Sequence, residues 1–375
     1  MKEKSKPHLL HIFNTFNPGG AQTRLVALAN HFGPSLRHSI VAMDGHFSCA
    51  EKFDPNLDIT LIPLEVRKNT LVGNLKKFRG VLSRLDADRL ITHNWGTIEW
   101  AVANWPLFVP HIHVEDGFGP DEANGQFLRR ILARRLLLQK SLVVVPSLTL
   151  ARIARHDWHI SASRLRFVPN GVDCERFSRQ NPETTSGARQ PQGWQGNGAI
   201  IGTVATLRSE KNLSRLIRAF AEVLKKMPCR LVIVGDGSEI VSLKALAARL
   251  EVSNAVTFTG HINDPSPVYR QFDIFALTSD TEQMPYTVLE AMAAGCPIVA
   301  TDVGDVRHMV AAPNRPFVVA RDDGAVTSAL FELLSNKELQ RTIGNVNARH
   351  VEVAYDQRAM FRAFTELYQL RGLSS

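Results

Sequence analysis

The chain of 375 residues contains 44 lysines and arginines against 36 aspartates and glutamates, and 44% of its residues are hydrophobic. This length is most simply divided into two domains of ordinary size, and the composition is normal for a globular protein. No apolar run approaches the roughly 20 residues of a membrane-spanning helix, so none is predicted. The N-terminal stretch is basic and then briefly apolar, and its apolar part carries His11 and Asn14. We therefore expect a first strand there and not a signal peptide.

Cysteines and charges suggest the surroundings of the protein. The four cysteines are scattered without a C-x-x-C pair, which favours reduced thiols in a cytosolic protein and argues against a zinc site. Residues 1–180 contain 24 basic and 16 acidic residues, whereas residues 181–375 contain 20 of each. A basic first half indicates an anionic surface or substrate near it. No nucleic-acid-binding motif is present, so nucleic acid is not an expected partner.

The first half alternates short apolar runs with helix-like segments. Leu9–Phe13 is predicted to be a buried strand, followed by a turn with Gly19 and Gly20 and by a helix over Ala21–His31. This order is typical of a doubly wound domain, in which ligands bind at the carboxyl ends of the strands. The glycines allow the backbone to approach a phosphate or a sugar closely. Further strands are expected at Ser39–Met43, Ile59–Leu64, Leu90–His93, His111–Val114, Leu142–Val145 and Leu165–Val168, and Ser147 is expected to cap the next helix.

A second series of strands and helices follows residues 179–198, which are rich in Gly, Pro, Gln and Ser and are predicted to be a linker. Strands alternating with helices on both sides of a linker indicate two parallel-sheet domains. The expected strands are Ala199–Val204, Arg230–Val234, Ala255–Thr259 and Asp273–Leu277, and the expected helices are Asn212–Lys226, Glu239–Leu250 and the terminal amphipathic Gln357–Arg371.

The stretch Ser279–Gly304 combines a loop, a helix with Pro285 in its first turn, a stop at Gly295 and an apolar strand. Glu282 lies in the loop and Glu290 about one turn into the helix. The start of a helix favours a phosphate, because its N–H groups and its dipole are positive. A glutamate beyond the phosphate can accept hydrogen bonds from two ribose hydroxyls, and one before it can accept from hydroxyls of the group that the phosphate carries. The layout suits a nucleotide diphosphate sugar.

This stretch, with its sequence LEAMAAGCPIVATDVG, resembles the donor-binding motif of family 4 retaining glycosyltransferases of the GT-B architecture. The Pro169–Asp173 turn (PNGVD) and the segment Thr203–Leu213 (TVATLRSEKNL) extend the resemblance over almost the whole chain. It implies two Rossmann-like domains with a cleft between them, a nucleotide-sugar donor and retention of the anomeric configuration by same-face attack. It implies no cofactor and no catalytic metal, and the Asp86–Asp88 D-x-D sequence is interpreted as surface. UDP-sugars are the favoured donors and GDP-mannose is the alternative.

The resemblance also divides the chain. It implies an N-terminal acceptor-side domain at 1–178, the linker at 179–198, a nucleotide-sugar-binding domain at 199–355 and a terminal helix in 356–375 that crosses back to the first domain. The expected product is a bacterial polysaccharide or glycolipid, made from a glycan or lipid-linked acceptor. A cytoplasmic enzyme, alone or peripheral on the inner face of the membrane, fits these expectations. A sugar-nucleotide-binding protein with little transfer activity and a nucleotide-sugar epimerase stay open as alternatives.

The roles of donor-side residues follow from the same resemblance. Lys211 falls on the lysine that contacts the donor phosphates, whereas the usual arginine is Thr206 here, so Arg208 becomes the candidate for that phosphate. Glu282 would orient the sugar hydroxyls, with the amides of Gln283 and Met284 near the sugar, although E-Q-M-P replaces the usual E-G-F-G. The remaining donor contacts implied are Gly19 and Gly20 at the diphosphate and sugar, Pro285 at the helix start, Glu290 at the ribose, and His261 and Ile262 beside the base.

On the acceptor side the resemblance aligns Asp116 with a histidine of the family, next to the transferred sugar. A carboxylate there could accept a hydrogen bond from the sugar or position the acceptor hydroxyl. His113 is the rival candidate for this role. Trp95 and His93 end another strand, where Trp95 either stacks on an acceptor sugar or packs in the core.

Residues 126–140, QFLRRILARRLLLQK, interleave leucines with arginines. A basic amphipathic helix with a leucine-rich face can lie on anionic lipid, which would fit a lipid-linked acceptor. The alternative is a core-packing helix whose arginine face is solvated. The spacing does not decide between them.

Overall fold

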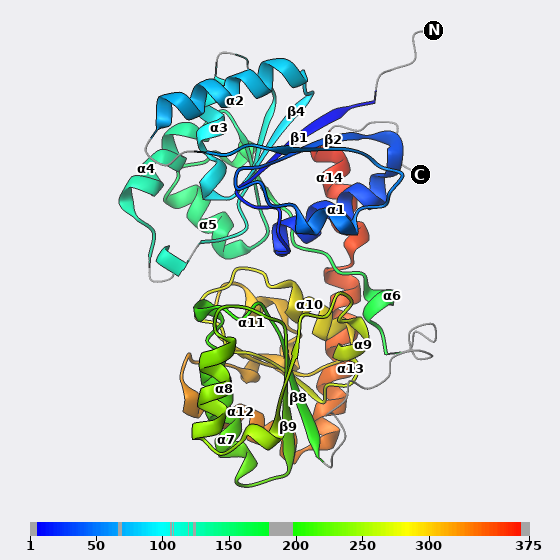
Figure 1. Cartoon of the computed structure of the whole chain (residues 1–375). Coiled ribbons are helices and arrows are strands. Elements are labelled where there is room, and N and C mark those ends of the chain that lie inside the picture. The colour runs from blue at the N-terminus through cyan, green and yellow to red at the C-terminus, as the bar shows by residue number, and fades with distance from the viewer. Residues whose placement is uncertain are drawn as a thin grey trace. The chain divides into compact units, whose positions relative to one another are not determined.

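The computed structural model describes residues 6–66, 70–105, 107, 109–118, 120–122, 125–179 and 198–368. Two compact units divide the chain at Pro169 and again at Ala359 (Figure 1). Unit 1 contains the chain up to Pro169 and the segment from Met360, and unit 2 contains Asn170–Ala359. Most of the predicted linker, residues 180–197, lies outside the described residues, as does the part of the predicted terminal helix beyond residue 368.

Unit 1 is built on a seven-stranded sheet in the order β3-β2-β1-β4-β5-β6-β7. All neighbouring strands pair in parallel. The strands are β1 (His8–Phe13), β2 (Arg37–Ala42), β3 (Asp58–Pro63), β4 (Arg89–His93), β5 (His111–Val114), β6 (Leu142–Val145) and β7 (Leu165–Phe167). The helices are α1 (Gly20–Phe32), α2 (Leu71–Leu85), α3 (Glu99–Asn104), α4 (Leu128–Leu137) and α5 (Leu148–His156). Ser147 caps α5 as predicted, since its side chain accepts the Leu150 N–H.

Alternate residues of β1 face opposite sides of this sheet, as the two-residue repeat of a strand requires. Leu9 packs with α1 and with the buried ring of Phe364 on α14 (Gln357–Leu367), and Leu10 packs with α2 and α3. The last helix therefore completes one face of unit 1 (Figure 1).

Unit 2 has a six-stranded parallel sheet in the order β10-β9-β8-β11-β12-β13. The strands are β8 (Ala199–Val204), β9 (Cys229–Val234), β10 (Val256–Gly260), β11 (Ile274–Leu277), β12 (Ile298–Thr301) and β13 (Val318–Val319). The helices are α6 (Cys174–Phe177), α7 (Leu213–Leu224), α8 (Ile240–Arg249), α9 (Ser266–Tyr269), α10 (Tyr286–Ala293), α11 (Val306–Met309), α12 (Asp323–Ser335) and α13 (Lys337–Ala354). One face packs against α7, α8 and α12, and the other against α9 and α10.

The unit boundary at Pro169 differs from the predicted domain end at residue 178. Val172 and Phe177 are buried in the core of unit 2, beside Tyr269 and Val351. The backbone of Val172 also pairs with the segment at Tyr355–Gln357. The segment that follows Pro169 therefore packs with unit 2 before the linker begins.

Candidate functional site

The predicted donor residues of unit 2 gather where neighbouring strands end. The loops after β8, β11 and β12 leave the same edge of the sheet, because these three parallel strands are adjacent. Lys211 Nζ, from the first loop, donates to Glu282 Oε1 of the second at 2.6 Å. Ser279 Oγ donates to the same carboxylate oxygen at 2.8 Å. Two residues that are 71 positions apart in sequence thus form one partly buried ion pair.

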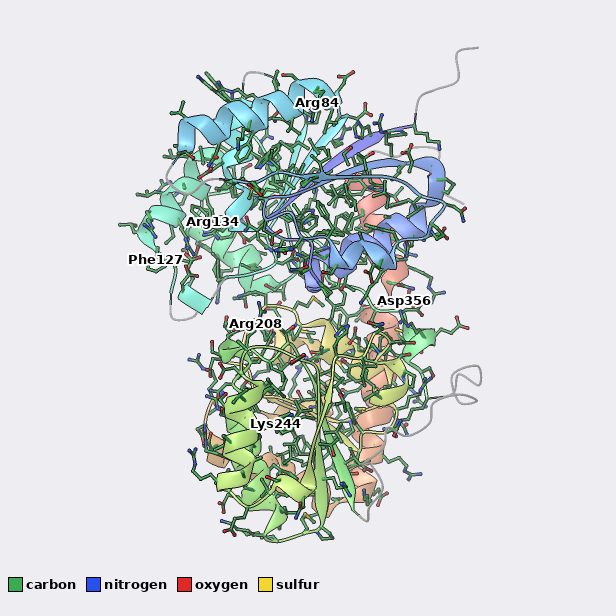
Figure 2. The ribbon with its side chains drawn as sticks, in the orientation of Figure 1. Arg84, Phe127, Arg134, Arg208, Lys244 and Asp356 are labelled. Atoms are coloured by element: carbon green, nitrogen blue, oxygen red, sulfur yellow. The ribbon has the colours of Figure 1, made fainter. Side chains whose placement is uncertain are left out.

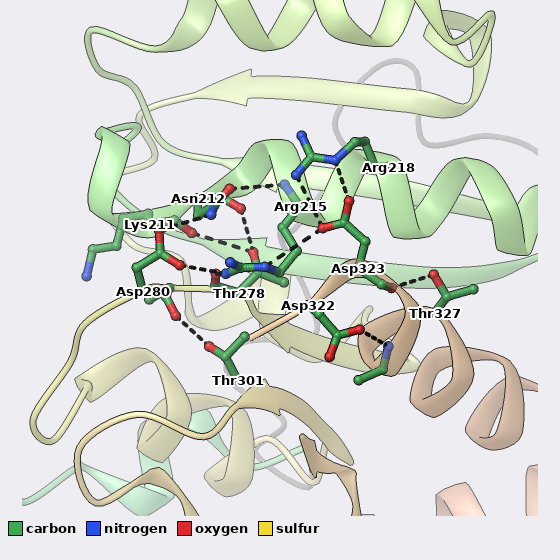
Figure 3. Close-up of polar contacts among 12 residues, drawn as sticks. Lys211, Asn212, Arg215, Arg218, Thr278, Asp280, Thr301, Asp322, Asp323 and Thr327 are labelled. Atoms are coloured by element: carbon green, nitrogen blue, oxygen red, sulfur yellow. Dashed lines mark hydrogen bonds and ion pairs between the residues drawn. The ribbon is translucent and has the colours of Figure 1, made fainter. Parts of the chain in front are cut away.

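A polar network of neighbouring residues includes Asn212, Arg215 and Asp280 (Figure 3). Asp280 accepts from Asn212 Nδ2 at 3.0 Å and forms an ion pair with Arg215 at 2.8 Å. Arg215 also donates to the Thr278 carbonyl, and Thr301 Oγ donates to the Ser279 carbonyl. These bonds tie the segments after β8 and β11 to each other and to the end of β12. Sequence reasoning missed this network, because its members do not stand out locally as functional residues.

The loop from Glu282 to Pro285 is held by a close packing contact near its start and by a hydrogen bond near its end. Gly304 has φ +54°, and a Cβ on it would lie 2.4 Å from the Glu282 carbonyl oxygen, so only glycine fits against the loop. On the other side, Asn170 Nδ2 donates to the Met284 carbonyl at 2.8 Å. The side chains of Gln283 and Met284 are buried, so this loop can offer backbone groups in a defined position.

Helix α10 starts one residue later than predicted, because Pro285 is its extended N-cap and not part of its first turn. Gly295, with φ +68°, ends the helix as predicted. Glu290 lies one turn into α10, and its Oε2 accepts a 2.6 Å hydrogen bond from the hydroxyl of Tyr269. Tyr269 is fully buried. Burial and the neighbouring Glu290 raise the pKa of Tyr269 well above its usual range, so the hydroxyl keeps its proton. Nothing in the spacing had marked Tyr269 as a functional residue.

The remaining donor candidates lie in more exposed positions. Arg208 is 57% exposed and forms an ion pair with Glu210, and Thr206 is exposed. The ring of His261 is exposed and contacts Asn263, and Ile262 is half-buried against the core. The turn after β9 supports the Arg208 loop, since Gly235 and Gly237 pack directly on the backbone of Ala205 and Leu207.

In unit 1 the loops after β1, β4 and β5 meet at one edge of the sheet. Asp116 forms a bidentate ion pair with the buried guanidinium of Arg24 on α1, with one bond of 2.7 Å. The Asp116 N–H donates to Asn94 Oδ1 at 2.7 Å. Gly19 is the extended N-cap of α1, and both Gly19 and Gly20 are exposed. Arg24, the partner of the predicted carboxylate, was not anticipated.

The three acceptor candidates differ in their burial. His113 is fully buried between Thr92 and Glu115, and His93 stacks on Phe13 with ring centroids 3.9 Å apart. Trp95 is half-buried under the guanidinium groups of Arg130 and Arg134, at 5.3 and 4.9 Å from its ring centroid. In the described conformation the two histidines lie inside unit 1.

Helix α4 buries one of its arginines and exposes several of its leucines. Arg134 is fully buried, donates to Glu115 and lies over the rings of Trp95, Phe118 and Trp158. Although burial opposes it, Arg134 holds the pKa of Glu115 below its usual range. The leucines at positions 128, 132 and 136 are 70%, 46% and 74% exposed, and the ring of Phe127 is also exposed (Figure 2). Of the two open alternatives, the core-packing helix with a solvated arginine face therefore does not describe Arg134 or these leucines.

The described parts of the chain contain neither a candidate metal cluster nor a candidate membrane span. No group of three or more His, Cys, Asp or Glu residues in the described parts of the chain has an arrangement that would hold a metal ion. Asp86 ends α2 and Asp88 accepts the His8 N–H, both at exposed positions. None of the described helices combines the length and the apolar character of a membrane-spanning segment.

Comparison with known families identifies the class of protein. Residues 18–176 match the family model described as Glycosyltransferase Family 4, and residues 186–350 match the model described as Glycosyl transferases group 1. With its two parallel-sheet units, the protein is a glycosyltransferase of the GT-B type. Within that class the chain belongs to the family 4 group.

Several curated relatives are glycosyltransferases. The D-inositol 3-phosphate glycosyltransferase of Corynebacterium jeikeium is 26% identical over 308 residues, which are 75% of this chain and 72% of that protein. The alpha-monoglucosyldiacylglycerol synthase of Streptococcus pneumoniae is 30% identical over 48% of this chain and 42% of its own length. The GDP-mannose-dependent monoacylated alpha-(1-6)-phosphatidylinositol monomannoside mannosyltransferase of Corynebacterium glutamicum is 29% identical over 54% and 55%. The chain spans only about half the length of the last two.

Solved structures share the fold at low sequence identity. Anabaena HepE in complex with UDP and glucose has a TM-score of 0.81 and 18% identity, covering 97% of this chain and all of that one. WaaG, a glycosyltransferase involved in lipopolysaccharide biosynthesis, has a TM-score of 0.74 and 19% identity, covering 96% and 99%. These likenesses confirm the predicted fold class.

Proposed function

We propose that the protein is a retaining glycosyltransferase that moves a sugar from a nucleotide diphosphate sugar to a glycan or lipid-linked acceptor. The observation that carries this proposal is the arrangement at one edge of the unit 2 sheet. Lys211 and Glu282 are in contact there, α10 begins just beyond them, and Glu290 follows one turn later. A cation, a helix N-terminus and two carboxylates in this order match a diphosphate flanked by two sugars.

Each group has a distinct part in this proposal. The ammonium of Lys211 and the first turn of α10 neutralise the charge that builds on the leaving diphosphate as the glycosidic bond breaks. Glu290 accepts hydrogen bonds from the ribose hydroxyls, and Glu282 accepts from hydroxyls of the transferred sugar. The backbone of the buried Gln283–Met284 loop lies beside that sugar, and His261 and Ile262 flank the base. Arg208 is a second candidate for the phosphate.

UDP-sugars are the donors we favour, with GDP-mannose as the alternative. The HepE structures contain UDP, UDP with glucose, and UDP-glucose, which supports the first. The name of the Corynebacterium glutamicum relative states dependence on GDP-mannose, which supports the second. The contacts with the base would be made mainly by backbone groups, so they do not discriminate between the two.

Retention is proposed to follow from attack on the same face of the sugar, with the leaving phosphate taking the acceptor's proton. On the acceptor side, Gly19 and Gly20 would face the diphosphate and sugar. Asp116, positioned by Arg24, would accept a hydrogen bond from the sugar or the acceptor hydroxyl. A fixed carboxylate is sufficient for this role, because the mechanism needs no strong enzyme base.

The donor assignment is tested by thermal shift with UDP, GDP and their sugars. We expect a rise in melting temperature with one nucleotide series, and we expect Glu290→Ala to abolish it. Glu332→Ala, the same change at an exposed position of α12, is the matched control and should leave the shift intact. An unchanged shift in Glu290→Ala would contradict the site.

Slow hydrolysis of the bound donor without an acceptor tests the mechanism. Proton NMR of the first-formed free sugar should show the anomeric configuration of the donor. An inverted product would contradict retention. A donor that binds but is never cleaved would indicate a binding protein, and conversion to a new nucleotide sugar would indicate an epimerase.

The surface of α4 supports a peripheral membrane location next to a lipid-linked acceptor. Its exposed leucines lie four residues apart on one stripe, and the neighbouring Arg129 and Arg135 are also exposed. Apolar side chains that enter the headgroup boundary between arginines favour anionic lipid. We expect cosedimentation with phosphatidylglycerol vesicles and little with phosphatidylcholine alone. A double Leu132→Glu and Leu136→Glu variant should bind at least about tenfold less, since it removes apolar area and adds repulsion.

Val241→Glu is the control for this experiment, because Val241 is as exposed (76%) as Leu136 (74%) but lies on α8 of unit 2. Equal vesicle binding by the α4 variant and the control would contradict a membrane role for α4.

A further inference from the structure

The roles proposed above give no function to the hydroxyl of Tyr269, a buried polar group of unit 2. The side chain has no exposed surface, and its ring packs against Phe177, Phe272 and Phe275 with centroids 5.6, 5.9 and 5.7 Å away. A hydroxyl in such surroundings is costly unless it has a partner. Here the partner is Glu290 Oε2, at 2.6 Å.

This bond takes up only part of the hydrogen-bonding capacity of Glu290. An ionised carboxylate has two oxygens and about four lone-pair sites, and the Tyr269 hydroxyl occupies one of them. The bond holds the flexible Glu290 side chain in one rotamer. The side chain therefore loses less conformational freedom when a ligand binds. The Tyr269 hydroxyl, which donates this hydrogen bond, is held rigidly, because three aromatic rings pack against the tyrosine ring.

We propose that Tyr269 is the positioning residue for ribose recognition: its hydroxyl holds Glu290 so that the carboxylate accepts from the 2′- and 3′-hydroxyls of the donor nucleoside. The inference rests on the proposed function, because it assumes that Glu290 binds the ribose. It adds that the site selects ribonucleotide donors, and that this selectivity depends on a residue that does not touch the ligand.

A merely structural role for Tyr269 would have a different consequence. Loss of core packing would weaken the binding of every nucleotide by the same factor. A positioning role acts only through the two ribose hydroxyls, so it disappears when the ligand lacks them. Comparing UDP with 2′,3′-dideoxy-UDP therefore separates the two roles within one variant.

The experiment is calorimetric titration of the full chain with these two nucleotides and with the corresponding GDP pair. We expect the wild type to bind UDP at least about tenfold more tightly than dideoxy-UDP, as two hydrogen bonds to a carboxylate would give. Tyr269→Phe should weaken UDP binding about five- to tenfold and leave dideoxy-UDP binding unchanged. Glu290→Ala should bind both nucleotides equally weakly, below the affinity that produces a thermal shift.

Tyr355→Phe is the matched control, because it deletes a hydroxyl from a half-buried tyrosine of the same unit and should change neither affinity. Binding of dideoxy-UDP by Tyr269→Phe shows that unit 2 of the variant is folded. If Tyr269→Phe keeps the full discrimination, or weakens both nucleotides alike, the positioning role is wrong, while loss of discrimination in Glu290→Ala alone would still support the proposed function. A wild type that binds neither UDP nor GDP would overturn the proposed function and this inference with it.

Discussion

At the scale of single residues, the candidate site consists of pairs that are distant in sequence. The helix start pointed to Glu282 and Glu290, and the family resemblance added Lys211 and Asp116. Neither predicted their partners. Arg24 and Asp116 are 92 residues apart, and Asn170 and Met284 are 114 apart. Such contacts depend on the order of strands in the sheet, which no local spacing contains.

The Lys211–Glu282 pair allows a prediction about catalysis. Lys211→Ala should lower the rate of donor cleavage about a hundredfold, because it removes a cation from the developing diphosphate charge. Arg208→Ala should have a smaller effect, since Arg208 is more exposed and is paired with Glu210. The measurement is the initial rate of nucleotide release at saturating donor. A larger loss in Arg208→Ala than in Lys211→Ala would reverse the assignment of the phosphate contact.

At the scale of elements, β13 was missed, but every other strand was predicted to within two residues, because each is a short apolar run bounded by turn residues. Helix α4 shows where such reasoning stops. Its leucines and arginines interleave so evenly that period alone does not assign the buried face. The outcome depends on Glu115 and three aromatic rings contributed by other segments, which make Arg134 the inward residue.

Three buried histidines in the sheet of unit 1 make the stability of this unit depend on pH. Buried histidines on neighbouring strands are connected, since His38 contacts His11 at 3.3 Å and His11 contacts His93 at 3.5 Å. Burial lowers the pKa of all three, to about 4 for His38, while the unfolded chain titrates near 6.5. Below pH 6.5 the unfolded chain therefore binds protons that the folded unit does not. Stability is complete above about pH 7 and falls as the pH decreases toward 4, by roughly 2 kcal/mol per histidine at about pH 5.

Urea unfolding followed by the fluorescence of the buried Trp100 and Trp158 measures this dependence in unit 1. His38→Leu should reduce the pH slope by about one proton. His156→Gln, at an exposed position of α5, should leave the slope unchanged. A stability of unit 1 that is constant from pH 7 to 5 would contradict the account.

At the scale of the whole molecule, the end of the chain contributes to the unit in which the chain begins. Phe364 on α14 is 2% exposed among residues of β1 and β4, and the guanidinium of Arg24 lies 5.9 Å from its ring centroid. Phe364→Ala should therefore destabilise unit 1 by about 3–5 kcal/mol. It should also loosen the packing of Arg24, the ion-pair partner of Asp116. Urea unfolding by tryptophan fluorescence is the measurement. Phe331→Ala, at a 38% exposed ring of unit 2, is the control and should cost about 1 kcal/mol or less.

The bond from Asn170 to the Met284 carbonyl bears on the design of chimaeric enzymes. To exchange sugar-nucleotide specificity between relatives, the obvious hybrid joins the first half of one to the second half of the other within the Gly- and Pro-rich segment that ends near residue 198. Such a hybrid would bring a foreign Asn170 and Phe177 to a loop and core that evolved with other neighbours. Junctions at Pro169 and Ala359 keep Asn170 and Phe177 in the same parent sequence as the loop and the core that they contact. Hybrids joined at these two positions should therefore fold and retain the donor preference of the parent that supplies unit 2.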